Sequence, residues 1–164
     1  MSRKISINAM FTAFAVVLSY IETFVPVAGI PGVKLGLANF AIVLAIYMLG
    51  YKNAITINIV RILIIGAFFG NLFSISFSIA GAIISFIPMA VLKHTGKVSM
   101  VTVAITGGVF HNIGQVFVAT LVVDTYGVFS YVPVLIISGI ITGMVIGILS
   151  NIVYTRIKNI IKIY

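Results

Sequence analysis

Long, uninterrupted apolar runs dominate this chain, and short polar stretches separate them. A helix needs roughly 20 mostly apolar residues to cross a hydrocarbon core of about 30 Å. The runs are too long and too uniformly apolar for the alternating strands of a membrane barrel. The pattern therefore predicts an all-α, polytopic membrane protein with six transmembrane helices. The expected spans are residues 5–25, 35–49, 54–69, 73–92, 98–123 and 131–154, of which the second is short.

The connections between these runs are also short, so we expect one integral membrane domain over residues 1–164. The first connection, residues 25–34, is rich in Pro and Gly. Irregular backbone at membrane depth is tolerated where it is buried in protein or lines a cavity. This stretch is therefore a candidate for a lid or a re-entrant loop.

Composition and charge support the same class. Hydrophobic residues make up 62% of the chain and charged residues 7%, whereas a soluble domain carries about 25% charged residues. The formal net charge of +8 does not indicate nucleic-acid binding, because the cations sit between apolar runs and not on one basic face.

The distribution of cations predicts an orientation. With the N-terminus inside, only Lys34 lies outside, Arg61 lies within a span, and both acids, Glu22 and Asp124, lie outside. By the positive-inside rule we expect a protein of the cell membrane with both termini cytoplasmic. The cations expected on the inner side are Arg3, Lys4, Lys52, Lys93, Lys97, Arg156, Lys158 and Lys162.

Small residues recur four positions apart in several spans. Gly139, Gly143 and Gly147 share one face of the sixth span, and this spacing predicts close helix packing. Ala9 and Ala13 have the same spacing in the first span. For this alanine pair, packing within the bundle and contact with a partner protein both stay open.

Arg61 is the clearest polar residue inside a span, and Asn58 lies one turn earlier on the same face. Polar groups in hydrocarbon are costly and usually face the bundle interior or a cavity. Arg61 therefore needs a partner, which is Glu22 or Asp124, backbone carbonyls or an anionic ligand, unless the side chain snorkels to the cytoplasmic face.

Further polar groups extend the candidate site. His111 and Gln115 share a face of the fifth span, where the alternatives are structural hydrogen bonding and ligand binding. Cationic members of the set suit a phosphate or carboxylate, and an apolar remainder suits an isoprenoid tail or a planar ring. The candidate lining of an outward-opening site is Glu22, Lys34, Asn39, Asn58, Arg61, Asn71, His111, Asn112 and Gln115.

The sequence lacks the residues that several classes of enzyme require for catalysis. The sequence has no P-loop and no HExxH motif, and without cysteine it has no disulfide or thiol chemistry. Its two acids are far apart in the sequence, so no carboxylate cluster is expected to hold Mg²⁺. We therefore expect no metal, no cofactor and no catalytic residues.

Three segments carry a family resemblance. The run from Pro31 to Asn39 (PGVKLGLAN), Arg61-Ile62, and the run from His111 to Gln115 (HNIGQ) resemble the membrane family of heptaprenyl diphosphate synthase component I, also called the Gx transporter family. Prenyl synthase catalysis runs on aspartate-rich motifs, which this chain lacks. The resemblance therefore implies at most an accessory role beside a soluble prenyl diphosphate synthase.

The chain is also similar to the substrate-binding S-components of energy-coupling factor (ECF) transporters, which are six-helix bundles with cytoplasmic termini. Ala9 and Ala13 match the alanine motif through which these proteins contact a transmembrane coupling subunit. This similarity implies uptake of a small vitamin-, flavin-, quinone- or isoprenoid-related molecule with that subunit and ATPases, the loop 25–34 closing over the ligand.

The preferred interpretation is thus a substrate-binding membrane subunit of an ECF-like importer. The first alternative is a non-catalytic membrane subunit of a heptaprenyl diphosphate synthase. A structural assembly protein without a ligand is the second.

Overall fold

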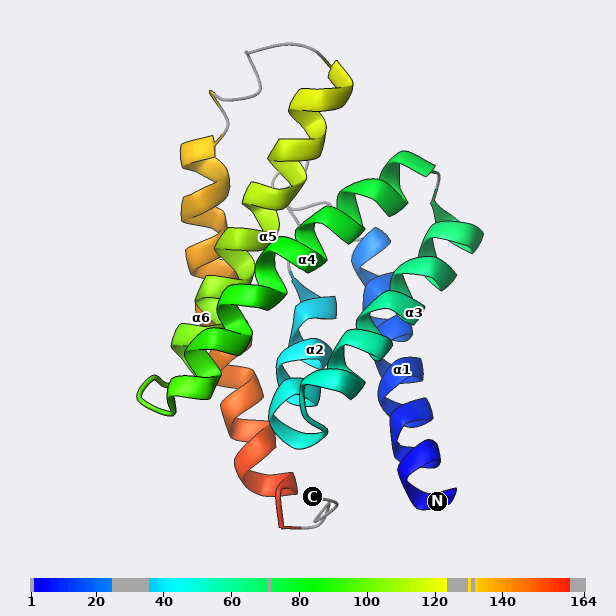
Figure 1. Ribbon diagram of the computed structural model, residues 1–164, viewed down its shortest axis with the longest axis vertical. Helices are drawn as coiled ribbons and strands as arrows, with labels where there is room; N and C mark the ends of the chain where they lie inside the picture. Colours follow the sequence, from blue (N-terminus) through cyan, green and yellow to red (C-terminus); the bar gives the residue numbers. More distant parts are fainter. Residues whose placement is uncertain (1, 25–35, 71, 124–129, 131, 160–164) are drawn as a thin grey trace.

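The structure is a computed structural model that describes residues 2–24, 36–70, 72–123, 130 and 132–159. Within these residues the regular secondary structure is helical, which confirms the predicted all-α class and the six helices (Figure 1). The helices are α1 (Ser2–Thr23), α2 (Leu37–Met48), α3 (Tyr51–Phe69), α4 (Leu72–Thr95), α5 (Met100–Val123) and α6 (Val132–Ile157).

Helix α2 differs from the other five in length. Its 12 residues extend over about 18 Å at 1.5 Å per residue, which is short of the hydrocarbon thickness. Among the described residues, the other five helices are long and apolar enough to cross a membrane. The expected second span is therefore a short helix, and the five long helices are compatible with a multi-pass membrane protein.

The turn between α2 and α3 is tighter than the sequence suggested. Residues 51–53 were expected to form a connection, but they make the first turn of α3. Gly50 allows this because it adopts φ 82°, a value that side-chain-bearing residues rarely take. Residues 93–95 likewise extend α4 beyond the expected span of residues 73–92. Its last turn carries Lys93, and a cation is favourable at a helix C-terminus.

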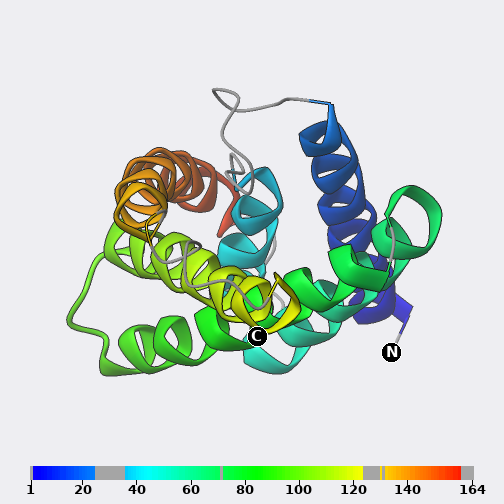
Figure 2. The same ribbon diagram turned by 90° about the horizontal axis from the view of Figure 1, so that it is seen from above.

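The two ends of the described chain lie at one end of the bundle. Helix α1 begins and α6 ends at the bottom of Figure 1, and the turn from α4 to α5 lies in the lower part of the same view. We call this the terminus end. Figure 2 shows the bundle from the opposite end, with the longer helices arranged around α2.

Helix α2 forms the centre of the core. Six consecutive residues, Ala41–Ile46, are buried, and they pack with Ala104 and Met89 of neighbouring helices. A helix that is apolar all round is covered either by lipid or by other elements of the protein, and α2 is covered by its neighbours. This explains why α2 reads as a continuous apolar run although it is too short to cross the bilayer.

The predicted glycine face of α6 is a packing surface. A Cβ atom on Gly143 would lie 2.6 Å from the Ile105 Cα, and one on Gly147 would lie 2.6 Å from the Val101 Cα. Gly139 faces Val109 in the same way, so α6 runs against the backbone of α5. This confirms the packing prediction for these glycines.

Candidate functional site

A polar cavity lies where residues from all six helices meet. It has a volume of about 50 Å³ and lies midway along α3, α5 and α6, near the end of α1 and the start of α2. Its lining consists of Glu22, Gly36, Ala38, Asn39, Asn58, Arg61, Ser78, Ser85, Gly108, His111, Asn112 and Thr142.

A second cavity, of about 80 Å³, shares Glu22, Arg61 and Ser78 with the first and extends between α1, α3 and α4. We refer to the two together as the polar cavity. A single water molecule needs roughly 10–15 Å³ measured in this way. The polar cavity therefore accommodates several waters or one compact polar group, such as a phosphate or carboxylate.

The guanidinium of Arg61 is held in position from two sides. Its Nε donates to the Oδ1 of Asn58 at 3.0 Å, and its Nη1 donates to the Oγ of Ser19 at 3.2 Å. The Ser19 hydroxyl donates in turn to the Ala15 carbonyl at 2.7 Å, so its oxygen is oriented to accept from Arg61. Asn58 and Ser19 are buried and neutral, so they orient the cation without cancelling its charge. The one carboxylate among the described residues of the polar cavity is that of Glu22, which also interacts electrostatically with Arg61.

Glu22 has a different role at the same cavity. Its Oε1 accepts a hydrogen bond from the backbone N–H of Gly36 at 2.5 Å. Gly36 adopts φ 76°, and its carbonyl accepts from Phe40 N at 3.1 Å in the first turn of α2. The carboxylate thus satisfies a backbone donor at the start of α2, a position where a negative charge is favourable. It links the end of α1 to α2.

Of the polar residues singled out on α5, Asn112 and His111 line the polar cavity and Gln115 does not. Asn112 is buried and donates from Nδ2 to the Leu135 carbonyl of α6 at 2.8 Å, so it joins two helices as well as lining the cavity. His111 packs over Gly81, where a Cβ atom would lie 2.7 Å from the imidazole. Gln115 is buried but does not line the polar cavity.

The structure thus brings six of the nine candidate residues to one cavity. These six are Glu22, Asn39, Asn58, Arg61, His111 and Asn112. Lys34 and Asn71 lie outside the described residues, as do Asp124 and the loop 25–34. Gln115 is the one described candidate that lies elsewhere.

Six polar residues at the polar cavity were not among the candidates, namely Ser19, Thr23, Ser74, Ser78, Ser85 and Thr142. Ser19 precedes Glu22 by three positions, so it shares a face of α1 with a candidate. Ser78 and Ser85 lie on one stripe of α4. Serine is common inside membrane helices, often bonding its own backbone as Ser85 does to the Ala82 carbonyl at 3.2 Å. The sequence signal was therefore weak.

Ala9 and Ala13 lie on the face of α1 that points away from the bundle. Both are exposed, whereas Phe11 and Ala15 of the same helix are buried. The alanine pair therefore does not pack inside the described bundle. It leaves a shallow face of α1 open to the surroundings.

One comparison with known proteins gives a match. The protein family described as heptaprenyl diphosphate synthase component I matches residues 11–153, which is most of the chain. Neither a curated protein nor a solved structure matches this chain.

Proposed function

The chain belongs to the heptaprenyl diphosphate synthase component I family, and from that premise we propose that it is a membrane subunit that binds a small anionic molecule and passes it on with the help of partner subunits. The proposal rests mainly on the position of Arg61. This cation lines a cavity inside an apolar bundle and is held there by the neutral groups of Asn58 and Ser19.

The size and chemistry of the polar cavity support recognition of one end of the ligand. A guanidinium binds phosphate and carboxylate through charge-assisted hydrogen bonds, and the cavity volumes of about 50 and 80 Å³ suit such a group. Asn39 and His111 add polar side chains beside it. A flavin, quinone-precursor or isoprenoid portion of the ligand would lie outside this small space.

The proposed orientation places the terminus end in the cytoplasm. Arg3, Lys4, Lys97, Arg156 and Lys158 belong to segments in the lower part of Figure 1, as the positive-inside rule requires of the inner side. The polar cavity then receives its ligand from the outer side. Ala9 and Ala13, exposed on α1, are the proposed contact for a membrane-embedded partner such as a coupling subunit.

Native mass spectrometry of the gently purified protein tests the proposal. We expect a bound small molecule on the wild type, and loss of that molecule from Arg61→Gln. For protein that is purified empty, flavin mononucleotide, 1,4-dihydroxy-2-naphthoate and geranyl diphosphate serve as added probes. Loss of one charge-assisted hydrogen bond of about 1.5–3 kcal/mol predicts at least a tenfold weaker complex.

Lys97→Gln is the matched control, because it removes one exposed cation away from the polar cavity. It should retain the ligand. Equal ligand retention by folded Arg61→Gln and the wild type would show that Arg61 does not bind it. Binding of no probe by the wild type would reject the proposal as a whole.

A second candidate function rests on the family name. The description heptaprenyl diphosphate synthase component I suggests a membrane subunit that assists a soluble prenyl diphosphate synthase. In this role the chain would anchor the synthase or receive its lipid product, and the synthase subunit would perform the chemistry.

Co-purification separates the two functions. The accessory role predicts that a soluble synthase encoded by the same organism is retained on the immobilised chain, and that its product yield rises when the chain is added. Arg61→Gln should leave that retention unchanged. If the synthase is neither retained nor stimulated, the accessory role is wrong.

A further inference from the structure

A separate, apolar cavity lies on the opposite side of α2 from the α3–α4 pair. It is a groove of about 290 Å³ between α1, α2 and α6, larger than either part of the polar cavity. We call it the apolar groove. Its lining consists of Met10, Phe11, Phe14, Phe40, Leu44, Met48, Val153 and Ile157.

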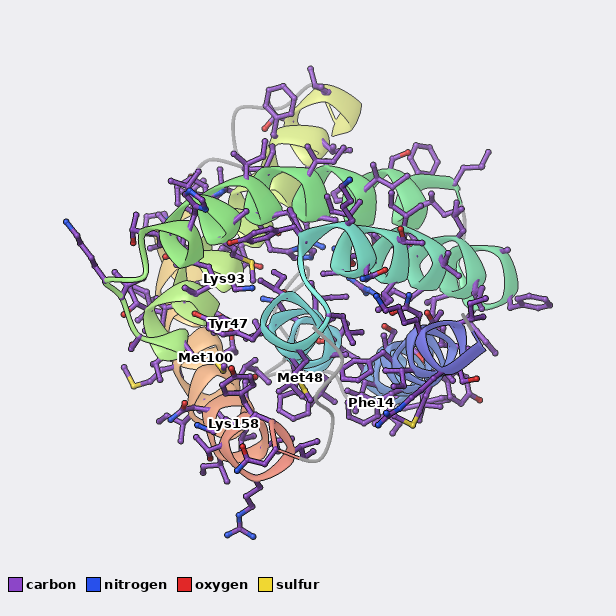
Figure 3. The ribbon with its side chains drawn as sticks, turned by 60° about the horizontal axis from the view of Figure 1, so that its bottom comes forward. Phe14, Tyr47, Met48, Lys93, Met100 and Lys158 are labelled. Carbon is purple, nitrogen blue, oxygen red and sulfur yellow. The ribbon has the colours of Figure 1, made fainter. Side chains whose placement is uncertain are left out.

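The groove opens on the outside of the bundle. Met10 is 56% exposed and Phe14 40% exposed, whereas Leu44 and Phe11 beneath them are buried. The Phe14 and Phe40 rings meet edge to face with their centroids 6.0 Å apart and form one wall. Figure 3 shows Phe14 and Met48 on adjacent helices in the view of the terminus end.

The lining suits a flexible hydrocarbon chain. All eight residues are apolar, so the groove offers nothing to a polar ligand. Two of them are methionines, whose unbranched side chains adapt to irregular apolar partners. Helix α2 forms the floor and is shorter than its neighbours, so the groove lies between two longer helices that both pack on α2.

Cations lie at the terminus end of the groove. Ile157, at the end of α6, is flanked in sequence by Arg156 and Lys158, both exposed. On α1, Arg3 is exposed and precedes Met10 by seven positions, which places it on the same helix face. Lys158 is labelled at the end of α6 in Figure 3. The two walls of the groove therefore both end in positive charge.

We propose that the apolar groove binds one anionic phospholipid, with an acyl chain in the groove and the phosphate between the cations of α1 and α6. The charge pattern selects this occupant, since a hydrocarbon chain fits the walls and a phosphate group fits their charged ends. This site is separate from the polar cavity and does not depend on the proposed function.

Lipid titration followed by native mass spectrometry tests the site. The purified protein in detergent is titrated with dioleoyl phosphatidylglycerol and, separately, with dioleoyl phosphatidylcholine. Because each nearby cation contributes about fivefold to binding of an anionic lipid, the first phosphatidylglycerol should bind at least about fivefold more tightly than phosphatidylcholine. Replacing Lys158→Gln and Arg156→Gln together should remove most of this preference.

Two further variants test binding of the acyl chain separately from binding of the lipid headgroup. Met48→Trp fills the groove and should weaken both lipids, whereas Phe117→Trp, on an exposed face of α5, should weaken neither. Lys97→Gln should keep the lipid preference, because Lys97 lies in the α4–α5 turn.

Three results would overturn the proposal. One is equal binding of the two lipids to the wild type. Another is an unchanged preference in the double Lys158 and Arg156 variant, which alters only exposed side chains and so tests the site without disturbing the fold. The third is displacement of phosphatidylglycerol by undecaprenyl phosphate at equimolar amounts, which would assign the groove to an isoprenoid.

Discussion

Lys93 illustrates how a single side chain completes the short helix at the centre of the bundle. Its Nζ donates to the Ile46 carbonyl near the C-terminus of α2. It also lies 5.1 Å from the ring centroid of Tyr47 and 4.6 Å from that of Tyr51. The last carbonyls of a helix lack partners within the helix, and a cation there is favourable. One residue of α4 thus holds the α2–α3 turn.

Replacing Lys93→Met should therefore destabilise the protein while keeping the size of the side chain. The lost charged hydrogen bond and cation–π contacts predict a decrease of about 1–3 kcal/mol in the free energy of unfolding. Unfolding in a mixed-micelle titration measures this change. Lys97→Met, at an exposed position, should stay within about 0.5 kcal/mol of the wild type. Equal effects of the two variants would contradict the assigned role of Lys93.

Arg61 and its neighbours show what local spacing reveals at the same scale. The separation of three positions correctly placed Asn58 beside Arg61, and they bond at 3.0 Å. The sequence could not supply Ser19, which reaches Arg61 from α1 across 42 positions of chain. Periodicity describes neighbours on one helix, whereas contacts between helices depend on how the helices pack.

Pairs of helices are held together in two ways in this bundle. Helices α5 and α6 approach closely through glycine, as the 2.6 Å separation at Gly143 requires. Helix α1 is joined to α3 by polar bonds near each of its ends, from Asn8 Nδ2 to Asn53 Oδ1 at 3.0 Å and from Arg61 Nη1 to Ser19 Oγ. Close packing through small residues and interhelical hydrogen bonds are expected to stabilise helix association in lipid, where the hydrophobic effect does not favour contact between helices.

Gly143→Ala should separate α6 from α5. The added Cβ would meet the Ile105 Cα, which is backbone and cannot rotate away, so the helices must shift. Overpacking of this kind costs about 1–3 kcal/mol, and the midpoint of thermal unfolding in detergent should fall. Met144→Ala alters the next residue on the exposed face and should have a much smaller effect. A wild-type midpoint for Gly143→Ala would show that the two helices are not in such close contact.

At the scale of the whole molecule, the arrangement of the helix ends bears on topology. Helix α1 begins and α6 ends at the same end of the bundle, as an even number of helices with alternating direction requires (Figure 1). The predicted number of six helices is confirmed, and α2, although too short to cross the bilayer by itself, runs back toward the terminus end and so preserves this alternation. Which end faces the cytoplasm rests on the distribution of cations.

The absence of cysteine from the sequence makes that orientation directly measurable. We expect Lys97→Cys to react with a membrane-impermeant maleimide only after the cells are permeabilised, because the α4–α5 turn is cytoplasmic in the proposed orientation. Ser130→Cys, before α6, should react in intact cells. The reverse labelling pattern would place the terminus end outside and invalidate the outward-opening site.

Hydrophobic patterning determined the class of this protein, the existence of all six helices and the glycine face of α6, because these depend on properties that repeat along one element. Tertiary structure decided which polar residues meet. It brought Ser19 to Arg61, placed Ser78 and Thr142 at the same cavity, left Gln115 elsewhere, and exposed Ala9 and Ala13. It also created the apolar groove, whose walls look like any other apolar stretch in sequence. These features arise between helices, where crossing angle and approach distance set the neighbours, and no single helix encodes them.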